Sequence, residues 1–204
     1  VHALSIQDAP LGDLPATLLS LQHLEFLSLP GCSIMLSASS AQGLEGMKGL
    51  TFLDLNHNPL AHTPDFSQLP SLRRVLLRNT GLREVPAGLL RSDQHVTVDL
   101  SNNAIENLPP TAFTLPNTAV RGIDLSGNPL SKPTLEQVKT YCQRTGEFFK
   151  AEANPGERER IQQLYPTFVD SEINRFIFKL PGDMDAVTNQ ISLLEEEYRQ
   201  LGTD

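Results

Sequence analysis

The fold is decided by the stretch LTFLDLNHNPL, residues 50–60. Leucine occupies positions 1, 4, 6 and 11 of this stretch, and asparagine occupies position 9. The same frame, with other residues in place of some leucines, covers the chain six times at start-to-start spacings of 22 to 26 residues. The six copies start at Val1, Leu24, Leu50, Leu72, His95 and Val120. A period of this length predicts that one structural unit is repeated along the chain.

The frame assigns each position to one face of a β-strand. Side chains alternate along a strand, so positions 4 and 6 point inward while positions 3, 5 and 7 point outward. Position 9 lies where the strand turns away, and its side chain can satisfy buried backbone groups of the turn and of the neighbouring repeat. We predict a structural turn column of Cys32, Asn58, Thr80, Asn103 and Asn128. Because one unit cannot bury its leucines alone, the units must stack.

The repeated frame resembles the leucine-rich repeat family over residues 1 to about 145. This resemblance implies an α/β fold, a curved solenoid of six repeats with a parallel sheet on its concave side. The chain changes character after the repeats, since 27 leucines fall in the first 130 residues and 6 in the remaining 74. We predict a solenoid over residues 1–146 that a helix from Pro133 to Gly146 closes, a connector over 147–156, and a small α-helical segment over 157–204. That segment is expected to hold helices at about 157–165, 171–180 and 184–201.

The outward positions predict a binding surface for a protein partner on the concave face. Its residues are Phe26, Phe52 and Arg74 at position 3, Asp54, Leu76, Asp99 and Asp124 at position 5, and Arg78 at position 7. Exposed aromatic side chains and arginines with acidic flanks are the mixture expected of an interaction hot spot. In the alternative, loops cover the two phenylalanines and the arginines form ion pairs with Asp54 and Asp99, which leaves an ordinary solvated surface.

Composition and motifs exclude several other functions. The formal charge is -8 and no basic stripe is present, so nucleic acid is not an expected partner. No run of about eighteen apolar residues is present, so no membrane span is expected. His57 and His62 have no third ligand at a metal-typical spacing, and no phosphate-binding or dinucleotide-binding motif occurs, so neither a metal nor a cofactor is expected. Cys32 and Cys142 are expected to be buried and structural, which leaves no catalytic residue.

The C-terminal part carries a second resemblance. Residues 164–166, 176–182 and 194–201 are similar to linkers in large toxin-like bacterial proteins that join leucine-rich repeats to a novel E3 ligase (NEL) domain. In that family, ubiquitin is attached by a cysteine that has an acidic residue two places after it. Cys32 is followed by Ser33-Ile34 and Cys142 by Gln143-Arg144, so neither fits. The resemblance therefore implies a catalytic domain outside this chain, in a bacterial parent protein that is secreted or translocated into a host cell.

Three functional hypotheses follow. In the first, this chain is the recognition module that selects substrates for a NEL-type ubiquitin ligase, and a neighbouring domain of the parent docks on the C-terminal helices. In the second, it is a stand-alone adhesion or inhibitor module with no link to ubiquitin. In the third, the chain itself is enzymatically active. We rank them in this order, because no residue in the chain has a catalytic arrangement.

Overall fold

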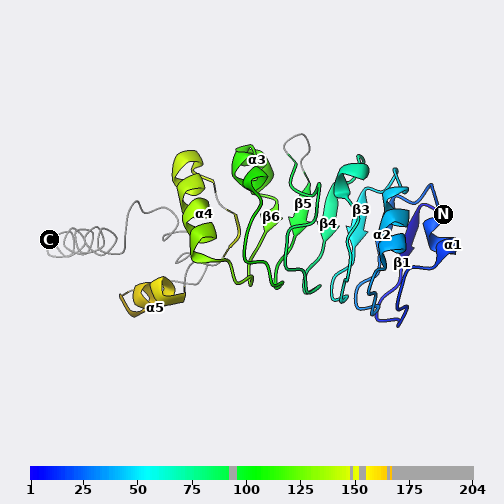
Figure 1. Cartoon of the computed structure of the whole chain (residues 1–204), viewed down its shortest axis with the longest axis horizontal. Coiled ribbons are helices and arrows are strands. Elements are labelled where there is room, and N and C mark those ends of the chain that lie inside the picture. Colours follow the sequence, from blue (N-terminus) through cyan, green and yellow to red (C-terminus); the bar gives the residue numbers. More distant parts are fainter. Residues whose placement is uncertain (92–95, 148, 152–154, 165, 167–204) are drawn as a thin grey trace, which may run out of the picture.

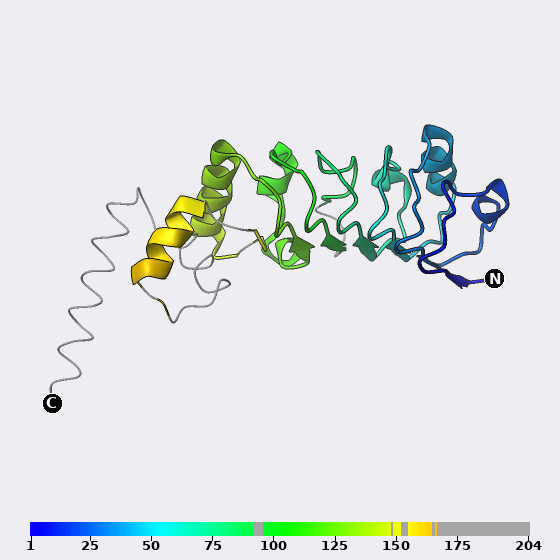
Figure 2. The ribbon, with the colours of Figure 1, turned by 90° about the horizontal axis from the view of Figure 1, so that it is seen from below.

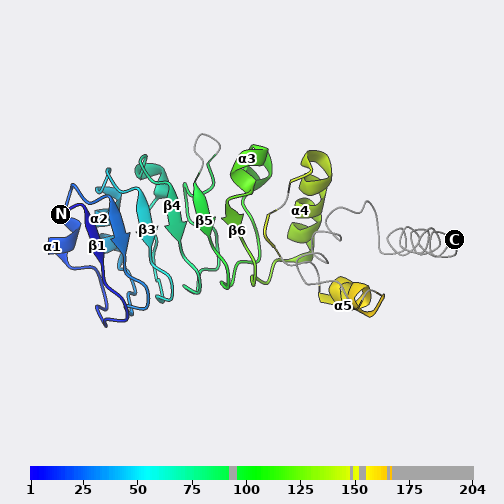
Figure 3. The same cartoon turned by 180° about the vertical axis from the view of Figure 1, so that it is seen from behind.

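Each of the six predicted repeats forms one short β-strand. The computed structural model describes residues 1–91, 96–147, 149–151, 155–164 and 166, and the strands within them form one parallel sheet in chain order. The strands are β1 (Ala3–Ser5), β2 (Phe26–Ser28), β3 (Phe52–Asp54), β4 (Arg74–Leu76), β5 (Thr97–Asp99) and β6 (Ile123–Asp124). They lie side by side along the long axis of the molecule (Figures 1 and 3). The prediction of an α/β leucine-rich repeat solenoid is confirmed.

Short helical turns return the chain between strands. These are α1 (Ala16–Leu19), α2 (Ala38–Glu45), the 3-10 turns η1 (Phe66–Gln68) and η2 (Pro110–Thr114), and α3 (Asn117–Val120). They lie on the opposite side of the solenoid from the strands (Figure 2). Pro15, Pro109 and Pro116 each precede one of these turns with extended backbone. Proline suits this place, because its fixed φ favours helix entry and the first turn has no hydrogen bond for an N–H to make.

The inward positions form one continuous core along the stack. In the five repeats from β2 to β6, positions 4 and 6 are at most 2% exposed. These residues are Leu27, Leu29, Leu53, Leu55, Val75, Leu77, Val98, Leu100, Ile123 and Leu125. The first repeat is covered on one side only, so Leu4 and Ile6 are half-buried. Burying a side chain of this kind contributes about 1.5–3 kcal/mol, so each repeat is held mainly by its neighbours. The start of the fifth frame, His95, lies outside the described residues.

The asparagines of the turn column connect successive repeats. The Nδ2 atom of Asn58 donates to the carbonyl oxygens of Leu29 at 2.8 Å and Leu55 at 3.0 Å, while its Oδ1 accepts from the backbone N–H of Ile34 at 3.0 Å. Asn103, in the turn after β5, and Asn128, in the turn after β6, each donate in the same way to one carbonyl oxygen of their own repeat and one of the preceding repeat. At Thr80 the hydroxyl donates within its own repeat, and the backbone N–H donates to Asn103 of the next repeat at 2.9 Å. The turn column therefore satisfies buried backbone groups of two repeats at a time.

Position 8 of every repeat adopts a left-handed backbone. Its φ values lie between 53° and 71°. The residues are Asp8, Gly31, His57, Asn79, Asn102 and Gly127. Glycine, asparagine and aspartate are the residues that tolerate this region best, and His57 is the exception. The repeat frame specifies no residue type at position 8, yet five of the six residues found there are glycine, asparagine or aspartate.

The helix α4 (Lys132–Thr145) closes the last repeat. It ends at Gly146, which has a φ of 73°, as the sequence predicts. Its N-cap is Ser131, whose side chain accepts from the backbone N–H of Thr134. The helix therefore begins at Lys132, one residue before the predicted Pro133.

The chain after α4 returns to the sheet. Lys150 forms a parallel bridge with Asp124, and its carbonyl oxygen accepts from the backbone N–H of Leu125 at 2.6 Å. Phe149 is buried, with its ring centroid 5.4 Å from that of Tyr141. Residues 149–151, in the predicted connector, therefore continue the sheet beyond β6. The helix α5 (Pro155–Leu164) overlaps the helix that the sequence predicts at about 157–165. The other two predicted helices lie outside the described residues.

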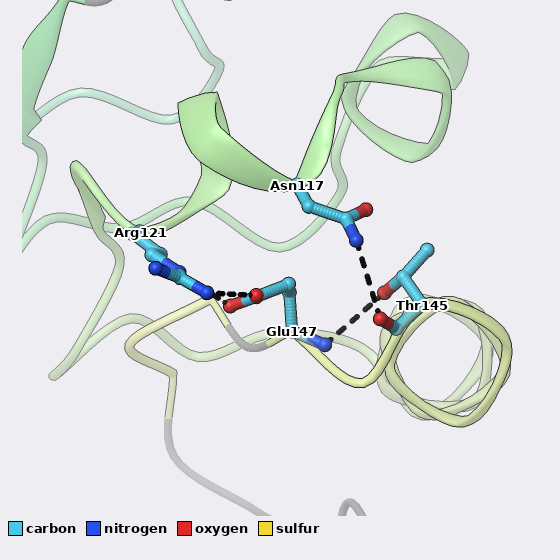
Figure 4. A network of polar contacts seen from close by, with 4 residues as sticks. All are labelled: Asn117, Arg121, Thr145 and Glu147. Carbon is cyan, nitrogen blue, oxygen red and sulfur yellow. Dashed lines mark hydrogen bonds and ion pairs between the residues drawn. The ribbon is translucent and has the colours of Figure 1, made fainter.

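A polar network ties the end of α4 to the last repeat. The guanidinium of Arg121, just after α3, forms an ion pair with Glu147, and its Nε donates to Oε2 at 2.8 Å. Asn117 donates to the carbonyl oxygen of Thr145 at 3.3 Å, and the backbone N–H of Glu147 donates to the Thr145 hydroxyl (Figure 4). Arg121 lowers the pKa of Glu147 by hydrogen bonding to its carboxylate. These contacts fix the turn from which residues 149–151 enter the sheet.

Candidate functional site

The candidate site is the side of the sheet that carries positions 3, 5 and 7, which we call the open face. At position 3, Phe26 pairs with Phe52, and Phe52 pairs with Arg74. The two rings stack with centroids 4.3 Å apart and planes 9° from parallel. The guanidinium carbon of Arg74 lies 5.9 Å from the Phe52 centroid, within the range of a cation–π contact. Three neighbouring strands thus place an aromatic pair and a cation in one row.

Position 5 forms a second row across the sheet. Asp54 pairs with Leu76, Leu76 with Asp99, and Asp99 with Asp124. Each of the three carboxylates accepts a backbone N–H two residues further on its own chain. For Asp99 and Asp124 the serine hydroxyl at that place also donates, at 2.6 Å. One oxygen of each aspartate therefore stabilises the turn that follows its strand, in the arrangement known as an Asx turn. The sequence analysis did not predict these turns.

Arg78 stands at the edge of the open face, where the strands end. Its backbone N–H donates to Oδ1 of Asn56 at 2.7 Å, which fixes its place in the row of position 7. Its guanidinium lies beside the amide of Asn102. With the amide turned to satisfy both groups, the Asn102 oxygen accepts from Nη2 at 3.1 Å and from Nε at 3.2 Å. Beside it, Asn79 contacts Nδ1 of His57 at 3.1 Å. This edge of the open face is therefore polar, and Arg78 and Asn79 present hydrogen-bond donors there.

The geometry differs from the solvated alternative in two respects. Phe26 is 37% exposed, and its ring stacks on that of Phe52. Within the described residues, neither Arg74 nor Arg78 forms an ion pair with a carboxylate. The eight predicted residues therefore lie on one face, in the rows that the frame assigns. Their role in binding a partner stays a prediction.

The two cysteines lack the surroundings of a nucleophile. Both thiols are free and buried. The Sγ atom of Cys32 lies 3.4 Å from the carbonyl oxygen of Ile6, in the turn column. Burial raises the pKa of the Cys142 thiol to about 11, so this group stays protonated near neutral pH. A reactive cysteine needs an exposed, electropositive niche that lowers its pKa.

The described residues also form one surface depression and several isolated polar contacts. A depression of about 660 Å³ lies beside the turns after β4 and β5 and is lined partly by Arg83, Glu84 and Asn107. Among the residues that the structure places, no three histidine, cysteine or acidic side chains converge as metal ligands. His62 instead has its Nδ1 atom 3.3 Å from the carbonyl oxygen of Leu36. No described helix is long and apolar enough to cross a membrane.

Comparison with known proteins finds a likeness among solved structures. No protein-family model and no curated protein matches the chain. Among solved structures, the chain is similar to a leucine-rich repeat protein of Leptospira interrogans, with 19% sequence identity and a TM-score of 0.48. The likeness covers 73% of this chain and 49% of the Leptospira protein, so the chain spans about half the length of that protein. The resemblance to proteins with a NEL domain stays a prediction.

Proposed function

We propose that this chain is a protein-interaction module without catalytic activity of its own, and that it binds its partner across the open face. The observation that supports this best is the row of Phe26, Phe52 and Arg74. Aromatic side chains and arginines dominate the binding energy of protein interfaces. Here they stand side by side on strands whose inward side chains are buried.

The scaffold makes such binding efficient. Because the backbone of each strand is fixed by the core and by the turn column, little conformational entropy is lost when a partner binds. Six strands at about 4.8 Å provide about 24 Å of sheet. A standard interface buries about 800 Å² on each partner, so the turns at the sheet edge, including Arg78, must contribute to the contact.

The test is a triple variant, Phe52→Ala with Arg74→Ala and Arg78→Ala. We expect it to abolish capture of partners that the native chain retains and that are then identified by mass spectrometry. The thermal midpoint should fall by no more than about 6 °C. An aromatic pair contributes about 0.5–1.5 kcal/mol, and a domain of this size loses about 2–4 °C per kcal/mol.

A double variant, Arg83→Ala with Glu84→Ala, serves as the control. Both side chains are exposed and lie beside the turns instead of on the open face. This variant should retain every partner. If the triple variant also captures the same partners at native levels, the partner binds elsewhere and the open-face proposal is wrong.

A finer proposal concerns the parent protein. We propose that the module selects substrates for a NEL-type ubiquitin ligase, and the support is the resemblance of residues 164–201, which lie almost wholly outside the described residues. The complete gene should then encode a Cys-x-Asp sequence after residue 204, and the full-length protein should transfer ubiquitin. A signal peptide upstream and a stop codon soon after residue 204 would favour the stand-alone adhesion or inhibitor module instead.

A further inference from the structure

The row at position 3 has one unoccupied aromatic face. The ring of Phe52 has a neighbour on each side, Phe26 on one and the guanidinium of Arg74 on the other. Among the described residues, the ring of Phe26 stacks only on Phe52, and its other face is directed toward β1, the neighbouring strand on that side. There the residue in register is Ala3, whose exposed side chain is a methyl group. A large apolar side chain from a ligand can therefore stack on Phe26 above Ala3.

In the same row, the cation Arg74 has no acidic partner among the described residues. Arg74 is exposed and, among the described residues, forms no ion pair. The neighbouring carboxylate of Asp54 is engaged by the backbone N–H of Asn56 and the hydroxyl of Ser28. An acidic group that approaches Arg74 beside the Phe52 ring is partly shielded from water, which strengthens its attraction to the guanidinium.

The strand spacing sets the distance between these two places. Ala3 and Arg74 lie in the same row on β1 and β4, three strand spacings apart. At about 4.8 Å per spacing this is about 14 Å, and an extended peptide covers that length in about four residues. Resting on the proposed function, we propose that the open face of β1 to β4 binds an extended peptide segment of the partner. That segment carries an aromatic residue and an acidic residue about four positions apart.

Charge favours a peptide over single-stranded nucleic acid. Aromatic rings with a nearby arginine also suit the stacking of bases. A phosphate backbone, however, would cross the row of Asp54, Asp99 and Asp124 on the same face of a chain with a formal charge of -8. A single acidic residue of a peptide can be bound by Arg74 alone, whereas a nucleic acid strand needs positive side chains along the whole path of its phosphates.

The experiment is a selection of peptides of about twelve random residues, displayed on phage, against the full 204-residue chain. We expect enrichment of an aromatic residue three to five positions from aspartate or glutamate. Arg74→Ala should weaken the binding of a selected peptide by about tenfold or more and remove the acidic preference on reselection. Ala3→Phe fills the place above Ala3, and Phe26→Ala removes the stacking surface, so each should remove the aromatic preference.

Two exposed residues provide matched controls. Thr97→Ala changes position 3 on β5, outside the proposed contact, and Arg83→Ala removes the same charge as Arg74→Ala away from the open face. Both should bind the selected peptide within about twofold of the native chain. Thermal unfolding of each variant checks that the solenoid is intact, so that a loss of binding is not a loss of folding.

The possible results separate this inference from the proposed function. Selected peptides without an acidic bias, or equal binding by Arg74→Ala, would overturn the inference. Tighter binding of a single-stranded oligothymidine of about twelve nucleotides would also overturn it, in favour of nucleic acid. If the selected peptides do not contain the aromatic and acidic pair, and the triple variant does not bind them, the proposed function stands and only the inference falls. If the triple variant binds all selected peptides normally, both fall.

Discussion

Replacement of Asn58 by alanine should destabilise the solenoid strongly. The side chain is fully buried, and it hydrogen-bonds to the carbonyl oxygens of Leu29 and Leu55 and to the N–H of Ile34. Its Nδ2 also donates to the carbonyl oxygen of Asn56 at 3.2 Å, but that oxygen accepts from the backbone N–H of Gly31 as well, so it keeps a partner in the variant. Each buried group left without a partner costs about 1–3 kcal/mol. One water molecule that enters the space can satisfy one of the three groups left without a partner, so we expect a loss of about 2–6 kcal/mol. This is a large share of the roughly 5–15 kcal/mol that holds a typical domain.

A graded series makes this prediction specific to the turn column. Thr80→Ala removes a hydroxyl that donates to the carbonyl oxygen of Leu77 at 2.9 Å, so it should cost about 1–2 kcal/mol. Asn117→Ala removes one exposed contact of 3.3 Å to Thr145 and should stay within about 0.5 kcal/mol of the native chain. Urea unfolding followed by far-UV circular dichroism measures all three.

Hydrogen exchange locates the effect. In Asn58→Ala the amide of Ile34 loses its acceptor in the next repeat, so its protection should fall more than that of Thr80, whose acceptor Asn103 is untouched. An Asn58→Ala midpoint equal to that of Asn117→Ala would refute the reasoning. So would unchanged protection at Ile34, since the asparagine would then not connect the repeats.

Three further predictions concern the backbone, a thiol and a carboxylate. Gly88→Ala should lower the free energy of unfolding by about 1–3 kcal/mol more than Gly81→Ala, because both glycines have positive φ but only at Gly88 would a Cβ meet the backbone of η1, at 2.2 Å. Equal midpoints of the two variants in thermal unfolding would count against this. The Cys142 thiol, whose pKa burial raises to about 11, should react with Ellman's reagent near pH 8 only after urea is added, and immediate reaction of the native chain would show it to be accessible. Arg121 lowers the pKa of Glu147, so the stability from this pair is present above the ordinary pKa of about 4.3 and is lost as the pH falls through the lowered one. Glu147→Gln should therefore have a lower midpoint than the native chain near pH 7, and this difference should shrink as the pH falls below about 4.3, whereas a difference that stays constant with pH would contradict the pairing.

The repeat frame predicted the sheet because its physics is local and periodic. Once Leu53 and Leu55 point inward, Phe52 and Asp54 must point outward, and stacking of the inward positions puts equivalent frame positions of the next repeat in register even though the spacing varies from 22 to 26 residues. The adjacency of Phe26, Phe52 and Arg74 follows from this alone. The parallel stacking of the two rings does not, since it depends on side-chain torsions that the frame leaves open.

Other features escaped the sequence interpretation for identifiable reasons. The frame left position 8 free, although the Gly, Asn and Asp residues there indicate a left-handed backbone. The spacing of Asp99 to Ser101 and of Asp124 to Ser126 is typical of Asx turns, but the frame assigns these carboxylates to the outward binding surface and does not describe their contacts with their own turns. Residues 149–151 join the sheet without any repeat frame, because the contacts that hold Phe149 come from residues distant in the sequence. Such contacts leave no periodic signal.

The most direct test of the central claim is the labelling rate of single cysteines along β4 in the full chain. The native cysteines are buried and give a low background. Arg74→Cys should react with a maleimide reagent at nearly the rate of the unfolded chain, Val75→Cys should be protected, and Leu76→Cys should react at an intermediate rate, because their exposure alternates along the strand. Protection of Arg74→Cys to the level of Val75→Cys would contradict the account, since the open face would then be unavailable to a partner.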